Sequence, residues 1–289
     1  MFPAPITLKK YLGELKPCII CNSENLESWA KLDYLEAKKC RECGMISVNP
    51  HLTNEGLSKL YEGYFLSRLE QKEMSEKRKI SHKLDFDWIT KFINHGKVLD
   101  VGCSGGQFLS FFDPKKWERQ GVEIDKDTAL IAKTEYDIPV KIGYFPEISF
   151  EDKFDLIIIR GVIEHFSDPI SVLKKCAEVL KPNGYLFISA TPVGNSFAFH
   201  VYREKWVHYV PLIHIHFFTV DLLTRMLKNF NMSLIDQHYP YEETPYANPE
   251  KDFTKIENDI ILISQGKQDQ ISSTPFFGSV MTAVWQKNS

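Results

Sequence analysis

The most informative segment of this 289-residue chain is Val98-Leu99-Asp100-Val101-Gly102-Cys103-Ser104-Gly105-Gly106. It reads as an apolar strand that ends in a glycine-rich turn. Glu123 then closes the next strand-like run, Gly121-Val122-Glu123-Ile124-Asp125. Glycines let the backbone pass close to a ligand, and a carboxylate about 20 residues later can accept hydrogen bonds from both ribose hydroxyls. The order of strand, turn, helix, strand and acid therefore predicts a nucleoside cofactor site in an open α/β sheet.

The charge of the turn indicates which nucleoside. A dinucleotide needs a longer Gly-x-Gly-x-x-Gly turn at a helix N-terminus for its pyrophosphate, whereas Asp100 precedes the turn here. S-adenosylmethionine has no phosphate and carries a sulfonium and an ammonium, so an acidic loop suits it. The alternative is an ordinary buried strand and turn of another Rossmann-like fold.

The region after residue 96 alternates strand-like and helix-like segments. The run 154–159 is almost continuously apolar, as expected for a central parallel strand that is covered on both faces. We expect strands at 97–101, 122–124, 140–142, 154–159 and 185–190, and helices at 107–112, 128–135 and 171–180. This alternation predicts an α/β fold with a doubly wound sheet.

These residues resemble the class I S-adenosylmethionine-dependent methyltransferases, whose first motif runs Val-Leu-Asp-x-Gly-Cys-Gly-x-Gly. Ser104 stands at the second glycine of that motif. The runs 154–157, 162–169 and Leu180-Lys181-Pro182-Asn183-Gly184 are similar to later blocks of the family, and asparagine at 183 tolerates positive φ. Segment 276–285 is similar to the final antiparallel strand of the family's Rossmann-like sheet. The resemblance covers residues 96–289 and implies a methyltransferase that uses S-adenosylmethionine.

Four cysteines form two pairs, Cys18-x-x-Cys21 and Cys40-x-x-Cys43, with 18 residues between the pairs. Two such knuckles can complete a tetrahedron of thiolates around zinc. Four thiolates leave no open position for water or substrate, so we expect a structural zinc in a small ribbon over residues 14–50. Redox-active pairs are the alternative.

The order of ribbon, helices and methyltransferase region predicts three domains. They are a zinc ribbon at 1–52, a helical connector or lid at 53–95 and the methyltransferase domain at 96–289. In the connector, Leu57, Leu60, Tyr61, Tyr64 and Phe65 share a helix face. This order resembles sugar C- and O-methyltransferases of glycan and natural-product pathways. The C-methyltransferases usually carry a further C-terminal domain for which this chain has no room, so O-methylation is at least as well supported.

Candidate site residues follow from these motifs and from the resemblance. We expect Glu123 on the ribose, Asp100 supporting either the methionine end or the turn, and Arg160 lining the methionine pocket. The remaining candidate cofactor contacts are Gly102, Cys103, Ser104, Gly106, Ile124, Tyr144 and Phe145.

Three histidines are candidates for proton removal from the acceptor, since imidazole titrates near neutral pH. His165 follows the fourth strand, at the sheet edge where ligands bind. His214 falls on a histidine of the sugar C-methyltransferases, and His216 follows two residues later. Alternatively, His165 orients its loop, and His214 and His216 satisfy core hydrogen bonds.

Composition excludes several partner classes. The chain is 43% hydrophobic and 25% charged, as in ordinary globular proteins, and its net charge of −3 gives no basic field for nucleic acid or anionic lipid. The first ten residues lack an apolar signal core, and no apolar run reaches the roughly 18 residues of a membrane span. We therefore expect a cytoplasmic protein without a membrane partner.

The leading function is metal-independent methyl transfer to a small hydroxylated metabolite such as a sugar nucleotide or glycan precursor. A second is a nucleic-acid methyltransferase, because some rRNA guanine methyltransferases also bear a zinc ribbon. The lack of a basic stripe opposes it, as does Arg160-Gly161-Val162-Ile163 in place of an Asn-Pro-Pro-Tyr-type motif. A third is a non-catalytic scaffold, which the intact cofactor motif argues against.

Overall fold

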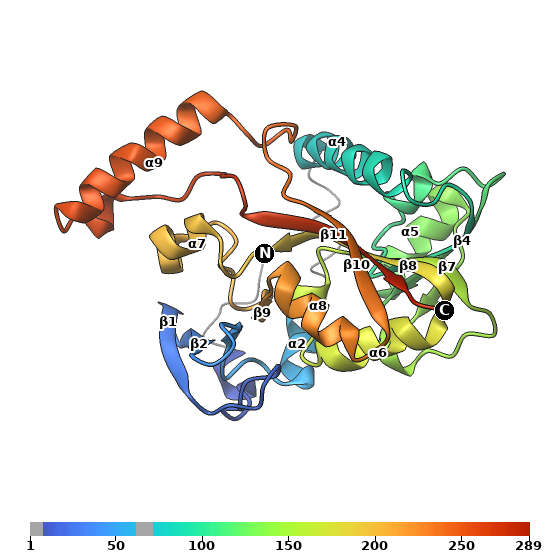
Figure 1. Ribbon diagram of the computed structural model, residues 1–289, viewed down its shortest axis with the longest axis horizontal. Helices are drawn as coiled ribbons and strands as arrows, with labels where there is room; N and C mark the ends of the chain where they lie inside the picture. Colours follow the sequence, from blue (N-terminus) through green and yellow to red (C-terminus); the bar gives the residue numbers. More distant parts are fainter. Residues whose placement is uncertain (1–7, 62–71) are drawn as a thin grey trace.

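Two β-sheets organise residues 8–61 and 72–289, the parts of the chain that the computed structural model describes (Figure 1). The larger sheet has the strand order β10-β11-β8-β7-β4-β5-β6, and the smaller sheet has the order β1-β2-β3-β9. The strands of the larger sheet are β4 (Gly96–Val101), β5 (Trp117–Glu123), β6 (Val140–Ile142), β7 (Phe154–Arg160), β8 (Leu180–Pro192), β10 (Met232–His238) and β11 (Val280–Lys287). Those of the smaller sheet are β1 (Leu26–Leu32), β2 (Leu35–Cys40), β3 (Ile46–Val48) and β9 (His216–Phe217).

The larger sheet is mostly parallel. Strand β4 pairs in parallel with β5 on one side and with β7 on the other, and β7 continues in parallel to β8. Strand β11 runs antiparallel to both β8 and β10. The predicted α/β fold with an antiparallel final strand is therefore confirmed.

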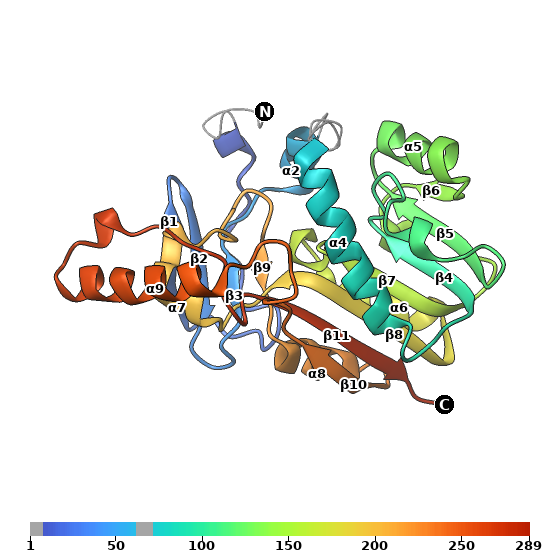
Figure 2. The same cartoon turned by 90° about the horizontal axis from the view of Figure 1, so that it is seen from above.

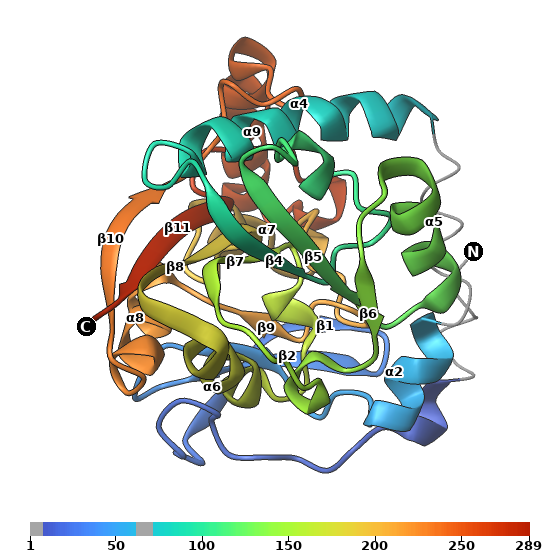
Figure 3. The same ribbon diagram turned by 90° about the vertical axis from the view of Figure 1, so that its right-hand side faces the viewer.

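Helices cover both faces of this sheet, as Figures 2 and 3 show. Helices α4 (Lys72–Ile89) and α5 (Lys126–Tyr136) lie on one face, and α6 (Pro169–Val179) and α8 (Val220–Lys228) lie on the other. Helices α7 (Phe197–Tyr202) and α9 (Pro249–Ser264) pack with the smaller sheet, and α2 (Asn54–Tyr61) packs against Ile213 and Ile215. Leu156 and Ile158 of β7 belong to the core cluster that includes Ile89 of α4, and the alternate residues Ile157 and Ile159 belong to the cluster under α6 and α8. This two-sided burial explains why β7 reads as a continuous apolar run.

One predicted helix is wrong. Residues 107–112 contain only a 3-10 turn, η2 (Leu109–Phe111), in place of an α-helix. Pro114 disfavours helical geometry at the residue before it, so little room remains after Gly106 for helical turns.

The link between α6 and the fifth parallel strand also differs in detail. The helix, predicted to run to residue 180, ends at Val179, and β8 begins at once with Leu180. Asn183 does adopt the expected positive φ, at 61°. Pairing between β7 and β8 is irregular here, since Phe154 lies opposite Leu180 but Leu156 lies opposite Tyr185.

The smaller sheet joins the N-terminal ribbon to the rest of the chain. Strand β9 pairs with β3 through Ile46 opposite Phe217 and Ser47 opposite His216. The domain limits at 52 and 95 stay predictions, and Tyr64 and Phe65 of the expected connector face lie outside the described residues. Among the helices of the described ranges, none has the length and apolar character that a membrane crossing needs.

Candidate active site

The carboxyl ends of β4 and β5 bring two buried carboxylates to the same edge of the sheet. Glu123, the last residue of β5, accepts three backbone N–H groups. Its Oε2 takes the N–H of Ser104 at 2.9 Å, and its Oε1 takes those of Ile124 at 2.7 Å and Asp125 at 3.1 Å. Burial raises its pKa, while these three hydrogen bonds act in the opposite direction. The side chain is thereby held against the glycine-rich turn.

The turn itself needs backbone conformations that favour glycine. Gly102, Ser104 and Gly106 have φ values of 74°, 51° and 79°. A β-carbon on Gly102 would lie 2.8 Å from Cγ2 of Val162. Cys103 is buried, and its sulfur lies beside Gly121. A β-carbon added to Gly121 would lie only 2.4 Å from this sulfur. The side chain of Cys103 therefore packs inside the fold.

Asp100 lies within this edge of the sheet and is buried. Its pKa is raised to about 8, chiefly by burial; Arg160 opposes this shift and nearby Glu123 adds to it. A group that is neutral here at pH 7 and negative when a cation approaches suits a ligand with a positive end.

Arg160, at the end of β7, is held by α4. Its Nε donates to Oδ2 of Asp85 at 2.8 Å, and the hydroxyls of Ser189 and Thr282 lie 3.4 and 3.3 Å from the same carboxylate. Burial raises the pKa of Asp85, and the Arg160 guanidinium opposes that shift. Arg160, which we predicted to line the methionine pocket, thus forms a buried ion pair that fixes α4 across the sheet.

Three of the remaining candidate cofactor contacts, Ile124, Tyr144 and Phe145, separate into two groups. Ile124 is 54% exposed, and the half-buried ring of Tyr144 lies 5.8 Å from that of Phe166. Phe145 is only 1% exposed and packs in the core beside Phe150. Its ring therefore supports the loop from within and offers no surface to a ligand.

His165 and His214 lie together beyond the end of β7. Their ring centroids are 5.1 Å apart with the planes nearly perpendicular, at 88°. The hydroxyl of Tyr61 lies 2.9 Å from Nδ1 of His165, and Nδ1 of His214 lies 2.6 Å from the carbonyl oxygen of His208. These contacts orient both rings.

Glu164 completes this group from within the fold. It is buried, accepts a hydrogen bond from the Thr191 hydroxyl at 3.2 Å, and lies 3.9 Å from Nε2 of His165 through its Oε1. Burial raises its pKa to about 8. Ligand atoms of Glu164, His165 and His214 all lie within 4.8 Å of one another. The group can exchange a proton or hold a divalent cation.

His216 is not part of that group. It lies in β9, where its Nδ1 is 2.9 Å from the hydroxyl of Ser47 and its ring faces His51. Burial lowers its pKa to about 3. The structure therefore joins two of the three candidate histidines and turns the third toward the ribbon.

The four cysteines of the ribbon converge on one point. The sulfurs of Cys18 and Cys43 are 3.4 Å apart, those of Cys21 and Cys40 are 3.5 Å apart, and all four lie within 4.8 Å of one another. Zn–S bonds of about 2.3 Å in a tetrahedron place sulfurs about 3.8 Å apart, so this donor set fits zinc.

Tyr61, Asp85 and Glu164 were not among the predicted site residues. The partners of Tyr61 and Asp85 lie 104 and 75 residues away along the chain, so no local pattern reveals them. Glu164 does carry a signal, because an acid beside His165 at the end of a central strand is a candidate by position alone.

Comparisons with known proteins agree with this geometry. A family model described as "Methyltransferase domain" matches residues 71–237. The ubiquinone biosynthesis O-methyltransferase of Aliivibrio fischeri is 28% identical over 100 residues, which are 32% of this chain and 43% of that protein. The chain thus matches less than half the length of such curated relatives.

Two solved structures show the same fold. One is an S-adenosylmethionine-dependent methyltransferase from Thermotoga maritima, at 16% identity and a TM-score of 0.54, covering 79% of this chain and 99% of that one. The other is the magnesium protoporphyrin IX methyltransferase of Synechocystis with bound S-adenosylhomocysteine, at 10% identity and a TM-score of 0.50, covering 74% and 84%.

The fold is that of the class I S-adenosylmethionine-dependent methyltransferases. The chain belongs to the methyltransferase-domain family, because the family model covers more than half of it. This confirms the predicted enzyme class.

Proposed function

We propose that this protein transfers a methyl group from S-adenosylmethionine to an oxygen atom of a small hydroxylated molecule. One observation carries the proposal: Asp100 and Glu123 sit at neighbouring strand ends beside a glycine-rich turn, with the His165–His214 pair past the adjacent strand β7. The family match and the O-methyltransferase relatives support the same reaction class.

Glu123 and Asp100 would hold the two ends of the cofactor. The Glu123 carboxylate, held by three backbone N–H groups, retains lone pairs for the ribose hydroxyls. Asp100 would face the positively charged methionine end, which favours its ionised form. When bound, S-adenosylmethionine supplies an activated methyl group, so the protein has to align the acceptor and remove its proton.

His165 is the proposed base for an acceptor hydroxyl. The Tyr61 hydroxyl engages Nδ1, so Nε2 is the atom that would accept the proton. The buried Glu164 carboxyl, whose pKa is raised to about 8, lies 3.9 Å from Nε2 and would bound the acceptor site on that side. His214 forms the opposite wall and would orient the acceptor.

For the acceptor we propose a sugar nucleotide or glycan precursor, on the resemblance of the ribbon, helices and methyltransferase region to sugar methyltransferases. Intermediates of ubiquinone biosynthesis are the second class to screen, because the curated relatives are named for that pathway.

We also propose one structural zinc on Cys18, Cys21, Cys40 and Cys43. The convergence of four sulfurs at the apex of two knuckles supports it. Each knuckle is closed by a backbone hydrogen bond to its first cysteine, from Asn22 to Cys18 at 2.8 Å and from Gly44 to Cys40 at 2.9 Å. Zinc content measured by atomic emission tests the site, independently of activity.

The decisive experiment is calorimetric titration of zinc-loaded protein with S-adenosylhomocysteine. Glu123→Gln should weaken binding by about tenfold or more, since hydrogen bonds to a charged group contribute about 1.5–3 kcal/mol. Glu135→Gln, an exposed acid on α5, is the matched control and should bind as wild type does. Absence of binding by the folded wild-type protein would refute the enzyme and favour the scaffold.

Methyl transfer is then assayed with labelled cofactor on sugar nucleotides, ubiquinone intermediates and RNA. His165→Gln should abolish transfer while S-adenosylhomocysteine affinity stays within about twofold, because His165 is not placed at the cofactor. Transfer to RNA alone would contradict the small-molecule proposal.

A further inference from the structure

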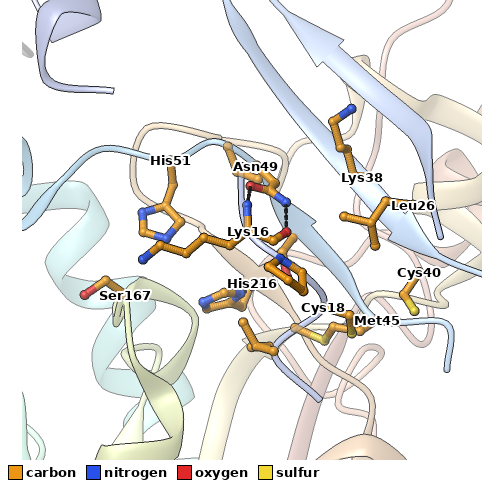
Figure 4. A pocket seen from close by; sticks show the side chains of 14 residues that line it. Lys16, Cys18, Leu26, Lys38, Cys40, Met45, Asn49, His51, Ser167 and His216 are labelled. Carbon is orange, nitrogen blue, oxygen red and sulfur yellow. Dashed lines mark hydrogen bonds between the residues drawn. The ribbon is translucent and has the colours of Figure 1, made fainter. Parts of the chain in front are cut away.

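Helix α2 contacts the loop that carries His165 at both of the helix's ends. At the first residue of the helix, Oδ1 of Asn54 accepts the Ser167 hydroxyl at 2.9 Å. At its last residue, the Tyr61 hydroxyl lies 2.9 Å from Nδ1 of His165. Figure 4 shows Ser167 with its hydroxyl turned away from His216 and toward this helix. Seven residues of α-helix rise about 10 Å, so α2 holds the loop at two well-separated points.

The apolar face of α2 packs against the second histidine segment. Leu57 and Leu60 are buried on this face, and their spacing of three residues puts them on one side of the helix. They share one core cluster with Ile213 and Ile215, the chain neighbours of His214. One short helix therefore contacts the segments of both histidines that meet beyond β7.

The two imidazoles differ in the atoms that their Nδ1 nitrogens face. Nδ1 of His214 lies 2.6 Å from the carbonyl oxygen of His208, and a carbonyl only accepts, so this nitrogen carries a proton. Nδ1 of His165 faces the Tyr61 hydroxyl, which can donate or accept. If the hydroxyl donates, the neutral imidazole holds its proton on Nε2, where it cannot act as a base. If the hydroxyl accepts Nδ1–H, Nε2 keeps its lone pair.

We propose that Tyr61 is a positioning residue for methyl transfer, with its hydroxyl accepting the Nδ1–H of His165. The inference rests on the proposed function, in which Nε2 of His165 is the base. The acceptor hydroxyl passes its proton to Nε2 as its oxygen bonds the methyl carbon, and the electron pair of the broken carbon–sulfur bond stays on sulfur. The imidazolium then carries two N–H groups, and its Nδ1–H still donates to Tyr61. Loss of the Nε2 proton to water restores the base.

The first test determines the tautomer of His165 in the resting protein. Long-range proton–nitrogen correlation spectra of the full, zinc-loaded chain distinguish a protonated ring nitrogen from one with a lone pair, and His165→Gln assigns the signals. We expect neutral His165 to hold its proton on Nδ1. Tyr61→Phe keeps the ring and removes the hydroxyl, so it should shift the population toward Nε2–H. A wild-type His165 with its proton on Nε2 would overturn the proposal, and that result depends on no variant of Tyr61.

The second test is the rate of methyl transfer. Tyr61→Phe should lower kcat by at least about tenfold, since a positioned base supplies about 10²–10⁴-fold. KM for the acceptor and the affinity for S-adenosylhomocysteine should stay within about twofold. The acid limb of the kcat/KM profile should move to lower pH, because the variant takes a hydrogen bond away from the imidazolium.

Two control variants separate positioning of the imidazole from support of the loop. Ser167→Ala removes the contact at the other end of α2 without touching the imidazole, and it should leave the tautomer and kcat as in wild type. Tyr185→Phe, at a half-buried tyrosine on β8, is the matched control for loss of a hydroxyl and should also behave as wild type. Equal losses of kcat for Ser167→Ala and Tyr61→Phe, with an unchanged tautomer, would mean that α2 only supports the loop and would refute the role of Tyr61.

Failure of this proposal stays distinct from failure of the proposed function. The tautomer is measured without cofactor or acceptor, so it is decided whether or not an acceptor is methylated. Absence of transfer by wild type counts against the proposed function. Transfer by a wild type whose resting His165 holds its proton on Nε2 counts against the role of Tyr61 alone.

Discussion

Replacing Gly102 with alanine should damage the cofactor turn through two separable effects. The first is backbone strain, because Gly102 has a φ of 74° and an L-residue there costs about 1–2 kcal/mol. The second is a collision, since the new β-carbon would lie 2.8 and 2.9 Å from the two γ-carbons of Val162. Carbon atoms prefer about 3.5–4.0 Å, and a β-branched side chain cannot easily rotate away.

Overpacking of this kind costs about 1–3 kcal/mol, so the two effects together predict a loss of about 2–5 kcal/mol in the free energy of unfolding. Gly266→Ala is the matched control. Gly266 has the same φ, 74°, but an added β-carbon there would have nothing within 4 Å, so only the strain of about 1–2 kcal/mol applies.

Urea unfolding followed by tryptophan fluorescence measures both variants, and calorimetry measures their affinity for S-adenosylhomocysteine. The double variant Gly102→Ala with Val162→Ala should recover the collision energy, giving a favourable coupling of about 1–3 kcal/mol. Equal losses for Gly102→Ala and Gly266→Ala, or zero coupling in the double variant, would refute the packing argument.

Three further outcomes are expected. Burial raises the pKa of Asp100 to about 8, against about 3.9 in the unfolded chain, so between these pH values the native state holds a proton that the unfolded chain has lost. The free energy of unfolding of the unliganded protein should therefore fall as pH rises through this window, while affinity for S-adenosylmethionine should rise. Cofactor binding should release a proton, which calorimetry in buffers of different ionisation enthalpy detects. Asp100→Asn should abolish this proton release. Asp85→Asn breaks a buried pair with Arg160 and should cost about 3–5 kcal/mol in urea unfolding, whereas Asp87→Asn, on the exposed side of the same helix, should cost at most about 1 kcal/mol. Cys40→Ser should bring zinc content close to zero by atomic emission and reduce methyl transfer more than S-adenosylhomocysteine affinity; equal losses would contradict a role for the ribbon at the acceptor side.

The sheet was predictable because its information is local. The apolar run of β7 indicates by its composition that the strand is buried, and the glycines after β4 indicate a turn. Strand β6 lies at the residues expected. Helix α8 also carries a local signal, with Thr219 as N-cap and apolar residues at helical spacing from Val220 to Leu227, although it was not predicted. Residues 107–112 show the limit of such reasoning, because helical periodicity there competes with a proline close behind.

The candidate site was predictable only in part, for a different reason. Glu123 and the glycine-rich turn belong to one short strand-turn-strand unit, so their separation along the chain predicts that they lie close together in the fold. The His165 group is assembled from segments that meet only after folding, since Tyr61 comes from α2 and His214 from the loop before β9. The core position of Phe145 was missed because an aromatic residue at a loop looks the same in sequence whether it faces a ligand or the interior.

The ribbon is hydrogen-bonded to the segment that carries His214, on the proposed acceptor side of the site. Ile215 links the two directly: its carbonyl accepts the N–H of Val48 in the ribbon sheet at 2.8 Å, and its N–H donates to the carbonyl of Glu164 at 2.8 Å. Since Ile215 lies between His214 and β9, the ribbon sheet sets the position of His214 relative to His165. Within the described residues, the three hydrogen bonds that hold Glu123 come from the turn and from its own loop, and no ribbon residue is among the donors. In the proposed mechanism the cysteine ribbon therefore supports the acceptor half of the site, which is why its loss should separate methyl transfer from cofactor binding.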